Sequence, residues 1–317
     1  MTLRVLPRAL AVGAIAAAAL LPLQASAFSN LVIFGDSLSD SGNNADVLGI
    51  GAHQVITGNS YIPTRPYASG TYSNGDVWAT SFAAGLGLSA VHSLAGGGNY
   101  AYGGAVAGGN ALFPPSLGKQ LTIYLGSAPA DAGGTLYVIA GGGNDARSVV
   151  SAIDGGADAT STINSAAATF AASIGSMVDT LQASGAQRII VWDAPNIGVA
   201  PALAASGDSA LGTQVAAAMN AALAARLNGE QGVSSFDIFN LVAQGQSYGL
   251  VNTTDACGAI AGCDPSTYLF WDGLHPTSAG HQIIADAMLA AVPEPATGLM
   301  FGLGLAAMAL CRRRLRG

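Results

Sequence analysis

The sequence has 317 residues, of which half are hydrophobic and only 9% are charged. Residues 28–292 hold five basic and 17 acidic side chains, a net charge of −12. So few cations argue against nucleic acid or anionic lipid headgroups as partners, while an uncharged ester substrate stays open.

The first 27 residues have the layout of a secretory signal peptide. Arg4 and Arg8 precede an apolar run over 9–23, and the small residues "ASA" follow at 25–27. We expect signal peptidase to cleave after Ala27, and we exclude this segment from the fold. The alternative is that it forms the first helix of the domain.

Continuous apolar runs in the rest of the chain are typical of strands buried on both faces of a sheet. They are "LVIF" at 31–34, "TLYVIA" at 135–140, "RIIVW" at 188–192 and "SSFDIFN" at 234–240, with a weaker run at 90–94. Helical periodicity appears over 163–184, 207–228 and 277–291. The alternation predicts one α/β domain over 28–292, a three-layer α/β/α sandwich with a central parallel sheet of about five strands.

Polar loops follow three of these expected strands. They read "GDSLSDSGNN" at 35–44, "GGGND" at 141–145 and "DAPN" at 193–196. In a parallel sheet, loops after the carboxyl ends of the strands share one rim, so we expect these loops to converge. Ser37 in the first loop is then a candidate nucleophile, although a serine in a polar loop is more often a turn residue.

A serine nucleophile needs a base, a carboxylate that orients the base, and donors for an oxyanion. His275 follows Asp272 by three residues in "WDGLHPT", which lets the carboxylate accept the Nδ1 proton. His53 and His92 have no such partner nearby. His281 lies within the last expected helix, where packing or a local hydrogen bond is its expected role.

Four segments, in chain order, resemble the sequence blocks of the GDSL, or SGNH, hydrolases. They are "FGDSLSDSGN", "NYAYGGA", "GGGND" and "DGLHPT", and "VWDAPNIGVAP" at 191–201 is similar to a further family segment. The resemblance covers nearly all of residues 30–290. It implies the flavodoxin-like SGNH hydrolase fold and a lipase or esterase that hydrolyses carboxylic esters without a metal or organic cofactor.

The resemblance also implies roles for individual residues. Ser37 matches the nucleophile, and Asp272 and His275 match the remaining members of a catalytic triad. The backbone N–H groups of Ser37 and Gly104 and the side chain of Asn144 match the oxyanion hole, with Gly103 as the alternative to Gly104. Other polar residues of the blocks are expected to cap helices and hold loops: Asp36, Asp40, Asn43 and Asp145.

The sequence leaves several alternatives open for the substrate and for the function. The protein could be an acetylesterase acting on exopolysaccharide, a noncatalytic surface or matrix protein that retains the fold, or a metal-dependent phosphoesterase, although the last needs more clustered His and Asp ligands. Residues 45–90 and 241–270 are expected to line the substrate side. Aromatic residues in or beside these segments could form a lipid groove, a sugar platform or plain core: Tyr61, Tyr67, Tyr72, Trp78, Tyr268, Phe270 and Trp271.

The C-terminal segment, 293–317, begins with Pro-Glu-Pro and continues through an apolar stretch, 297–311, to a tip rich in arginine. It resembles the PEP-CTERM sorting signal of Gram-negative bacteria. That resemblance implies an exosortase as processing enzyme, membrane contact through a transmembrane helix before processing, and a cell-surface or extracellular location; an ordinary membrane anchor is the alternative.

In an oxidising compartment Cys257 and Cys263 are expected to form a disulfide, the alternative being two free thiols.

Overall fold

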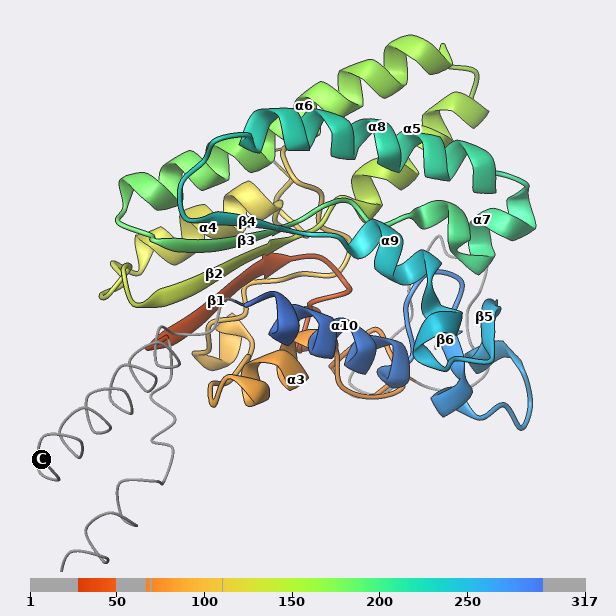
Figure 1. Ribbon diagram of the computed structural model, residues 1–317, viewed down its shortest axis with the longest axis horizontal. Helices are drawn as coiled ribbons and strands as arrows, with labels where there is room; N and C mark the ends of the chain where they lie inside the picture. The colour runs from red at the N-terminus through yellow and green to blue at the C-terminus, as the bar shows by residue number, and fades with distance from the viewer. Residues whose placement is uncertain (1–27, 50–66, 69, 110, 293–317) are drawn as a thin grey trace, which may run out of the picture.

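The computed structural model describes residues 28–49, 67–68, 70–109 and 111–292. They form three layers, with a parallel sheet between two sets of helices, which confirms the predicted α/β fold class (Figure 1). The predicted signal peptide, 1–27, and the predicted sorting segment with its apolar helix, 293–317, lie outside the described residues. Within the ranges that are described, no helix combines the length and apolar character needed to cross a membrane.

The main sheet has four parallel strands in the order β1-β2-β3-β4. Their bounds are β1 Asn30–Gly35, β2 Thr135–Ala140, β3 Arg188–Trp192 and β4 Val233–Phe236. The expected strands at 31–34, 135–140 and 188–192 are confirmed. β4 is shorter than the run at 234–240, because the Asp237 side chain accepts the N–H of Asn240 and starts a helix there.

The sheet therefore has four strands where about five were predicted. The weak run at 90–94 forms only an isolated bridge, between His92 and Asn99, and then enters the short 3₁₀ helix Ser93–Ala95. Three nearby glycines, residues 96–98, deprive this part of the chain of the side chains that a regular strand needs.

An extended segment, residues 98–102, runs along the free edge of β1 in place of a fifth strand. The N–H of Ile33 donates to Gly98 O at 3.0 Å, and Ile33 O accepts the N–H of Tyr100 at 2.8 Å. A Cβ atom on Gly98 would lie 2.2 Å from Leu31 O, so the approach requires glycine. This alignment carries the following glycines to the carboxyl end of β1.

Helices cover both faces of the sheet (Figure 1). Val32 and Phe34 of β1 pack in one core with α4, α5, α6 and α8, whereas Leu31 and Ile33 pack in the other with α3, α9 and α10. The split follows from the alternation of strand side chains between faces. The helices are α2 Asn43–Leu48, α3 Trp78–Gly85, α4 Leu117–Gly126, α5 Gly143–Asp154, α6 Ala159–Ala183, α7 Pro201–Ser206, α8 Ser209–Leu227, α9 Ile238–Ala243 and α10 Ser278–Ala291.

A second, two-stranded parallel sheet lies beyond the carboxyl ends of the main strands (Figure 1). It pairs β5 (Asn252–Ala256) with β6 (Tyr268–Phe270). The chain between them contains a disulfide, Cys257–Cys263, whose Cα atoms are 5.5 Å apart. The loop after β6 leads through residues 271–277 into α10, so this small sheet determines where that loop lies.

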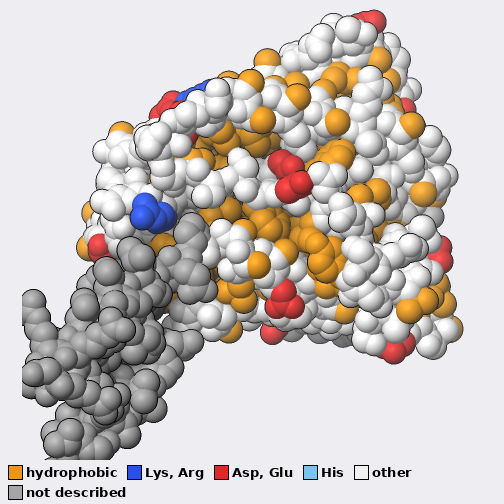
Figure 2. Space-filling view, viewed as in Figure 1, with side chains coloured by type: hydrophobic (Ala, Val, Ile, Leu, Met, Phe, Trp, Pro, Cys, Tyr) orange, Lys and Arg blue, Asp and Glu red, His pale blue; other side chains and the backbone are white. Residues whose placement is uncertain are grey.

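The surface agrees with the acidic composition. On the face shown in Figure 2, Lys and Arg side chains are few, and hydrophobic side chains are visible in the seam between the two helix layers. Lys119, Arg147, Arg188 and Arg226 are the cations within the described ranges. A cation beside a cleft is therefore an uncommon feature of this molecule.

Candidate active site

Ser37 lies just past the end of β1, and the backbone there is held tightly. Gln120 of α4 is fully buried; its Oε1 accepts the N–H of Gly35 at 2.9 Å and its Nε2 donates to Gly35 O at 2.8 Å. Asp36 O then accepts the N–H groups of Ser39 and Asp40, which closes a turn. The turn leaves Ser37 only 8% exposed at the rim of the sheet.

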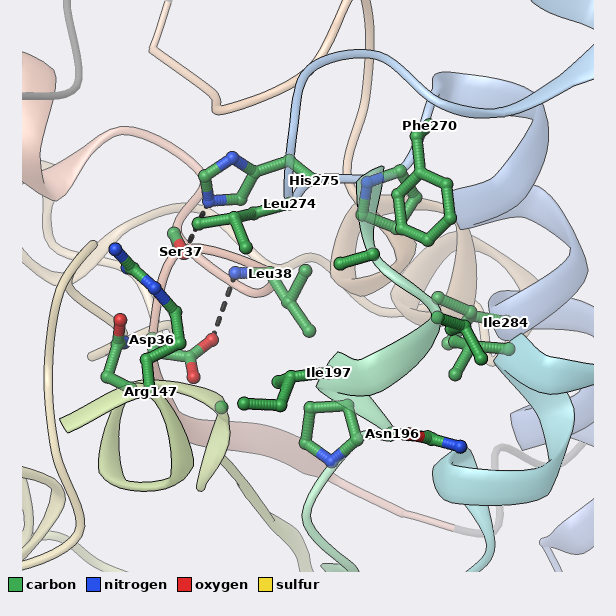
Figure 3. A pocket seen from close by; sticks show the side chains of 17 residues that line it. Asp36, Ser37, Leu38, Arg147, Asn196, Ile197, Phe270, Leu274, His275 and Ile284 are labelled. Atoms are coloured by element: carbon green, nitrogen blue, oxygen red, sulfur yellow. Dashed lines mark hydrogen bonds between the residues drawn. The ribbon is translucent and has the colours of Figure 1, made fainter. Parts of the chain in front are cut away.

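The structure brings Ser37, His275 and Asp272 into one chain of contacts, of which Figure 3 shows Ser37 and His275. His275 Nε2 lies 2.8 Å from Ser37 Oγ, and His275 Nδ1 lies 2.7 Å from Asp272 Oδ2. Asp272 Oδ1 accepts the backbone N–H groups of Leu274 and His275, both at 2.7 Å. The three-residue spacing therefore lets one carboxylate bind both the ring and the backbone of the histidine.

Burial would raise the pKa of Asp272, but the attraction of His275 and the hydrogen bonds from His275 and Tyr67 outweigh it and hold the pKa below its usual range. Asp272 is therefore ionised at neutral pH. A carboxylate accepts but cannot donate, so His275 Nδ1 carries the proton. Nε2 is then free to accept the proton of Ser37.

The two candidate oxyanion glycines differ in their surroundings. The N–H of Gly103 donates to Asp40 Oδ2 at 3.0 Å, and a Cβ atom on Gly103 would lie 2.3 Å from the ring of Tyr72. Gly104 is exposed, with φ +85°, and its N–H donates to no described residue. Of the two, Gly104 is the one whose N–H can reach a ligand.

Asn144 lies in the first turn of α5, whose cap Gly142 contributes no side chain. Asn144 Nδ2 donates to Ala105 O at 2.9 Å, which fixes the amide and leaves its second hydrogen to donate elsewhere. Asn144 and Ser37 line the same cleft.

That cleft has a volume of about 620 Å³, which includes the part open to solvent. The loops after β1, β2 and β3 meet at it, as the shared rim predicted. Asp36 and Arg147 lie at the Ser37 end, and Phe270 and Ile284 lie on the other side (Figure 3). Most of its walls are apolar: Leu38, Pro195, Ile197, Val199, Ala200, Val242, Phe270, Leu274 and Ile284.

The expected scaffolding residues bind backbone groups. Asp40 accepts the N–H groups of Gly42, Asn43 and Asn44 as well as that of Gly103. Asn43 Nδ2 in turn donates to the carbonyls of residues 99 and 101, and Asp145 accepts the N–H of residue 107. Burial raises the pKa of Asp40 and of Asp145 to about 6. Burial likewise raises the pKa of Asp36 to about 7.

The aromatic residues expected on the substrate side divide between several places. Trp78 is core, fully buried with its ring 4.7 Å from that of Trp192, and Tyr61 lies outside the described residues. Phe270 does line the cleft. Tyr67 donates a hydrogen bond to Asp272. No spacing in the sequence connects positions 67 and 272, so sequence reasoning could not find that contact.

The family follows from comparison with known proteins. Residues 31–288 match the model of the GDSL-like lipase/acylhydrolase family. The chain belongs to this family. Residues 291–314 match the PEP-CTERM protein-sorting motif.

Individual relatives of this GDSL-family chain are distant. Esterase EstA of Pseudomonas aeruginosa is 29% identical over 323 residues, which cover 85% of this chain and 48% of EstA. Lipase 1 of Photorhabdus luminescens is 36% identical over 181 residues, 56% of this chain and 24% of that protein. The chain thus spans about half the length of EstA. Among solved structures, Est24, a carbohydrate acetylesterase from Sinorhizobium meliloti, has 16% identity and a TM-score of 0.47, with 82% of this chain and 96% of that chain covered.

His281, expected to pack or to bond locally, packs without bonding. It is 1% exposed, and neither ring nitrogen has a hydrogen-bond partner within the described part of the chain. Burial, together with the nearby charge of His275, lowers the pKa of His281 to about 3. The ring is therefore neutral in the folded protein.

We predict that His281→Leu reduces the pH dependence of stability. In the unfolded chain the imidazole of His281 has a pKa near 6.5, whereas in the folded protein it stays unprotonated down to about pH 3. The contribution of this pKa difference to the free energy of unfolding is fully present above pH 6.5. It falls by about 1.4 kcal/mol per pH unit between pH 6.5 and about pH 3. Urea unfolding at several pH values between 4 and 7 measures the slope.

The control is Ile174→Val, a buried change in α6 that should lower the free energy of unfolding equally at each pH. If His281→Leu keeps the wild-type slope, the neutral buried state of His281 is wrong.

Proposed function

We propose that this protein is an exported serine hydrolase that cleaves carboxylic esters, with Ser37, His275 and Asp272 as its catalytic triad. The observation that carries the proposal is the continuous chain of contacts from Ser37 Oγ through the imidazole to a buried, ionised carboxylate. Membership of the lipase/acylhydrolase family supports the same reaction.

In the first half-reaction His275 Nε2 takes the proton of Ser37 while Oγ attacks the ester carbonyl carbon. The protonated imidazole is stabilised by Asp272 and then gives its proton to the departing alkoxide, which leaves as the alcohol. In the second half-reaction His275 takes a proton from water, which attacks the acyl group on Oγ. The carboxylic acid leaves, and Ser37 regains its proton.

The carbonyl oxygen gains negative charge in both tetrahedral intermediates and needs fixed donors. We assign these to the N–H groups of Ser37 and Gly104 and to Asn144 Nδ2. Gly104 is preferred to Gly103 because the Gly103 N–H already binds Asp40. The N-terminal end of α5, which has no side-chain cap, adds the positive end of a helix dipole beside Asn144.

We further propose that the acyl chain of the substrate lies in the apolar part of the cleft. Its walls from Leu38 to Ile284 offer carbon surface and few hydrogen-bond donors, so they suit a hydrocarbon chain better than a sugar. This favours a short- or medium-chain ester over the acetyl groups of an exopolysaccharide, which offer little hydrocarbon for these apolar walls to contact.

The processing steps are proposals of the same kind. Residues 1–27 would be removed by signal peptidase, and residues 293–317 would direct the catalytic domain, 28–292, to an exosortase through the PEP-CTERM motif. The sorting segment would contact the membrane before it is cut. The mature domain would then lie at the cell surface or outside the cell.

Labelling with a fluorophosphonate probe tests the nucleophile. We expect wild-type protein to bind one probe covalently at Ser37 and to turn over p-nitrophenyl esters, whereas Ser37→Ala should do neither. Ser39→Ala is the matched control, because Ser39 is two residues away and its hydroxyl bonds Trp78 instead of His275. A folded wild-type protein without labelling or turnover would leave a noncatalytic surface role.

Asn144→Ala should lower kcat by about 10²- to 10³-fold while the fold is kept, since one oxyanion donor is lost. Steady-state kinetics and circular dichroism measure the two effects. Asn240→Ala is the control, because Asn240 is exposed and its side chain donates to Asp237. Normal turnover in Asn144→Ala would exclude it as an oxyanion donor.

Among p-nitrophenyl esters from C2 to C16, we expect kcat/KM to rise from acetate to medium chains. Each buried CH₂ contributes about 0.8 kcal/mol. Ile284→Phe, which fills the side of the cleft away from Ser37, should lower the octanoate-to-acetate ratio several-fold. A parallel loss for every ester would place the acyl chain elsewhere, and a wild-type preference for acetate would favour the acetylesterase alternative.

A further inference from the structure

Tyr67 lies against the carboxylate that orients His275. Its hydroxyl donates to Asp272 Oδ2 at 2.5 Å, the same oxygen that binds His275 Nδ1. Tyr67 is 4% exposed and Asp272 is fully buried. Asp272 Oδ1 accepts the backbone N–H groups of residues 274 and 275, so these four hydrogen bonds hold the carboxylate. Three of the four come from the 272–275 loop itself, and the fourth comes from Tyr67.

The segment that carries Tyr67 is fastened to the same loop at further points. The ring of Tyr72 lies 5.3 Å from the imidazole of His275, and Ser73 Oγ donates to Pro276 O at 2.8 Å. Tyr67 and Tyr72 pack edge to face, with centroids 6.4 Å apart. The chain near residue 70 therefore supports the histidine loop at several adjacent positions.

We propose that Tyr67 is a positioning residue of the active site, which fixes Asp272 and tunes the basicity of His275 without touching the substrate. The inference rests on the proposed function, because it assigns Tyr67 a role in the same reaction. A hydroxyl that donates to Oδ2 stabilises the carboxylate and limits how strongly it attracts the protonated imidazole. It also holds Oδ2 in line with Nδ1.

Other groups that act electrostatically on this pair set the background. Arg147 acts on Asp272, and Asp36 and His281 act on His275, while Tyr72 faces the imidazole ring. All of them are retained when only the Tyr67 hydroxyl is removed. Burial and the charge of Asp272 raise the pKa of Tyr67 above its ordinary value, so its hydroxyl keeps its proton and donates to Asp272.

Tyr67→Phe tests the inference. Without the donor, Asp272 attracts the imidazolium more strongly, so the pKa of His275 should rise and the acid limb of the kcat/KM profile should move to higher pH. We expect kcat to fall about tenfold through looser alignment, with KM little changed. NMR titration of His275 reports its pKa whether or not the protein turns over an ester.

Tyr124→Phe is the matched control, since its buried hydroxyl bonds Tyr137 in the core on the other helical layer. It should move neither the His275 titration nor the acid limb. If folded Tyr67→Phe titrates like wild type, Tyr67 is only a structural residue and the inference fails. If the His275 titration shifts in Tyr67→Phe but wild type turns over no ester, the coupling holds and the proposed function fails.

Discussion

The candidate active site depends on how the backbone of β1 is held along both edges. β2 pairs with one edge in register, so that Gly35 lies opposite Ala140, and residues 98–102 bond the other edge up to Gly35 O. These contacts bring the turn after β1, the glycines at 103 and 104 and the loop after β2 together at the carboxyl end of the sheet. A slip of one residue would turn the side chains of β1 to the wrong faces, so the two buried cores fix the register.

Two buried carboxylates near the site differ in pKa because one of them is hydrogen-bonded directly by a histidine ring. Asp40 and Asp272 are both buried and both accept four hydrogen bonds, yet the pKa of Asp40 is raised and that of Asp272 is lowered. The bonds to Asp40 come from neutral backbone groups alone, and burial prevails. Asp272 bonds a histidine that becomes positive when it accepts a proton, so its carboxylate stays charged where the proposed mechanism forms an imidazolium.

Much of the fold could be predicted because the buried strands are nearly continuous apolar runs. The strand at 188–192 has the predicted bounds, and the long helix begins only a few residues before its expected start at 163. The absence of a fifth strand could not be predicted. Residues 98–102 lie along the edge of β1 through backbone hydrogen bonds, which leave no pattern in the side chains of that segment. Asp237 ended β4 early for a similar local reason, its capping bond to Asn240.

The residues of the candidate site could be named from the sequence, whereas the contacts that support them could not. Asp272 and His275 are close in sequence, and Ser37 follows a strand, so local patterns pointed to each. The choice between Gly103 and Gly104 needed the structure, because it depends on which N–H binds Asp40. The sequence left Tyr67 open between the substrate side and the core, and its bond to Asp272 could not be predicted, because a contact across about two hundred residues leaves no local pattern.

The disulfide is linked to the site through packing. A two-stranded sheet such as β5–β6 is marginal by itself in water, and needs cohesion from elsewhere. The bridge between Cys257 and Cys263 closes the chain between the strands, and Cys257 packs with Trp271 and Tyr67 in one buried cluster. Trp271 immediately precedes Asp272, and Tyr67 bonds its carboxylate. The disulfide therefore supports the buried cluster that contacts the Asp272 carboxylate, and disulfides are favoured in the oxidising compartments to which a sorting motif directs a protein.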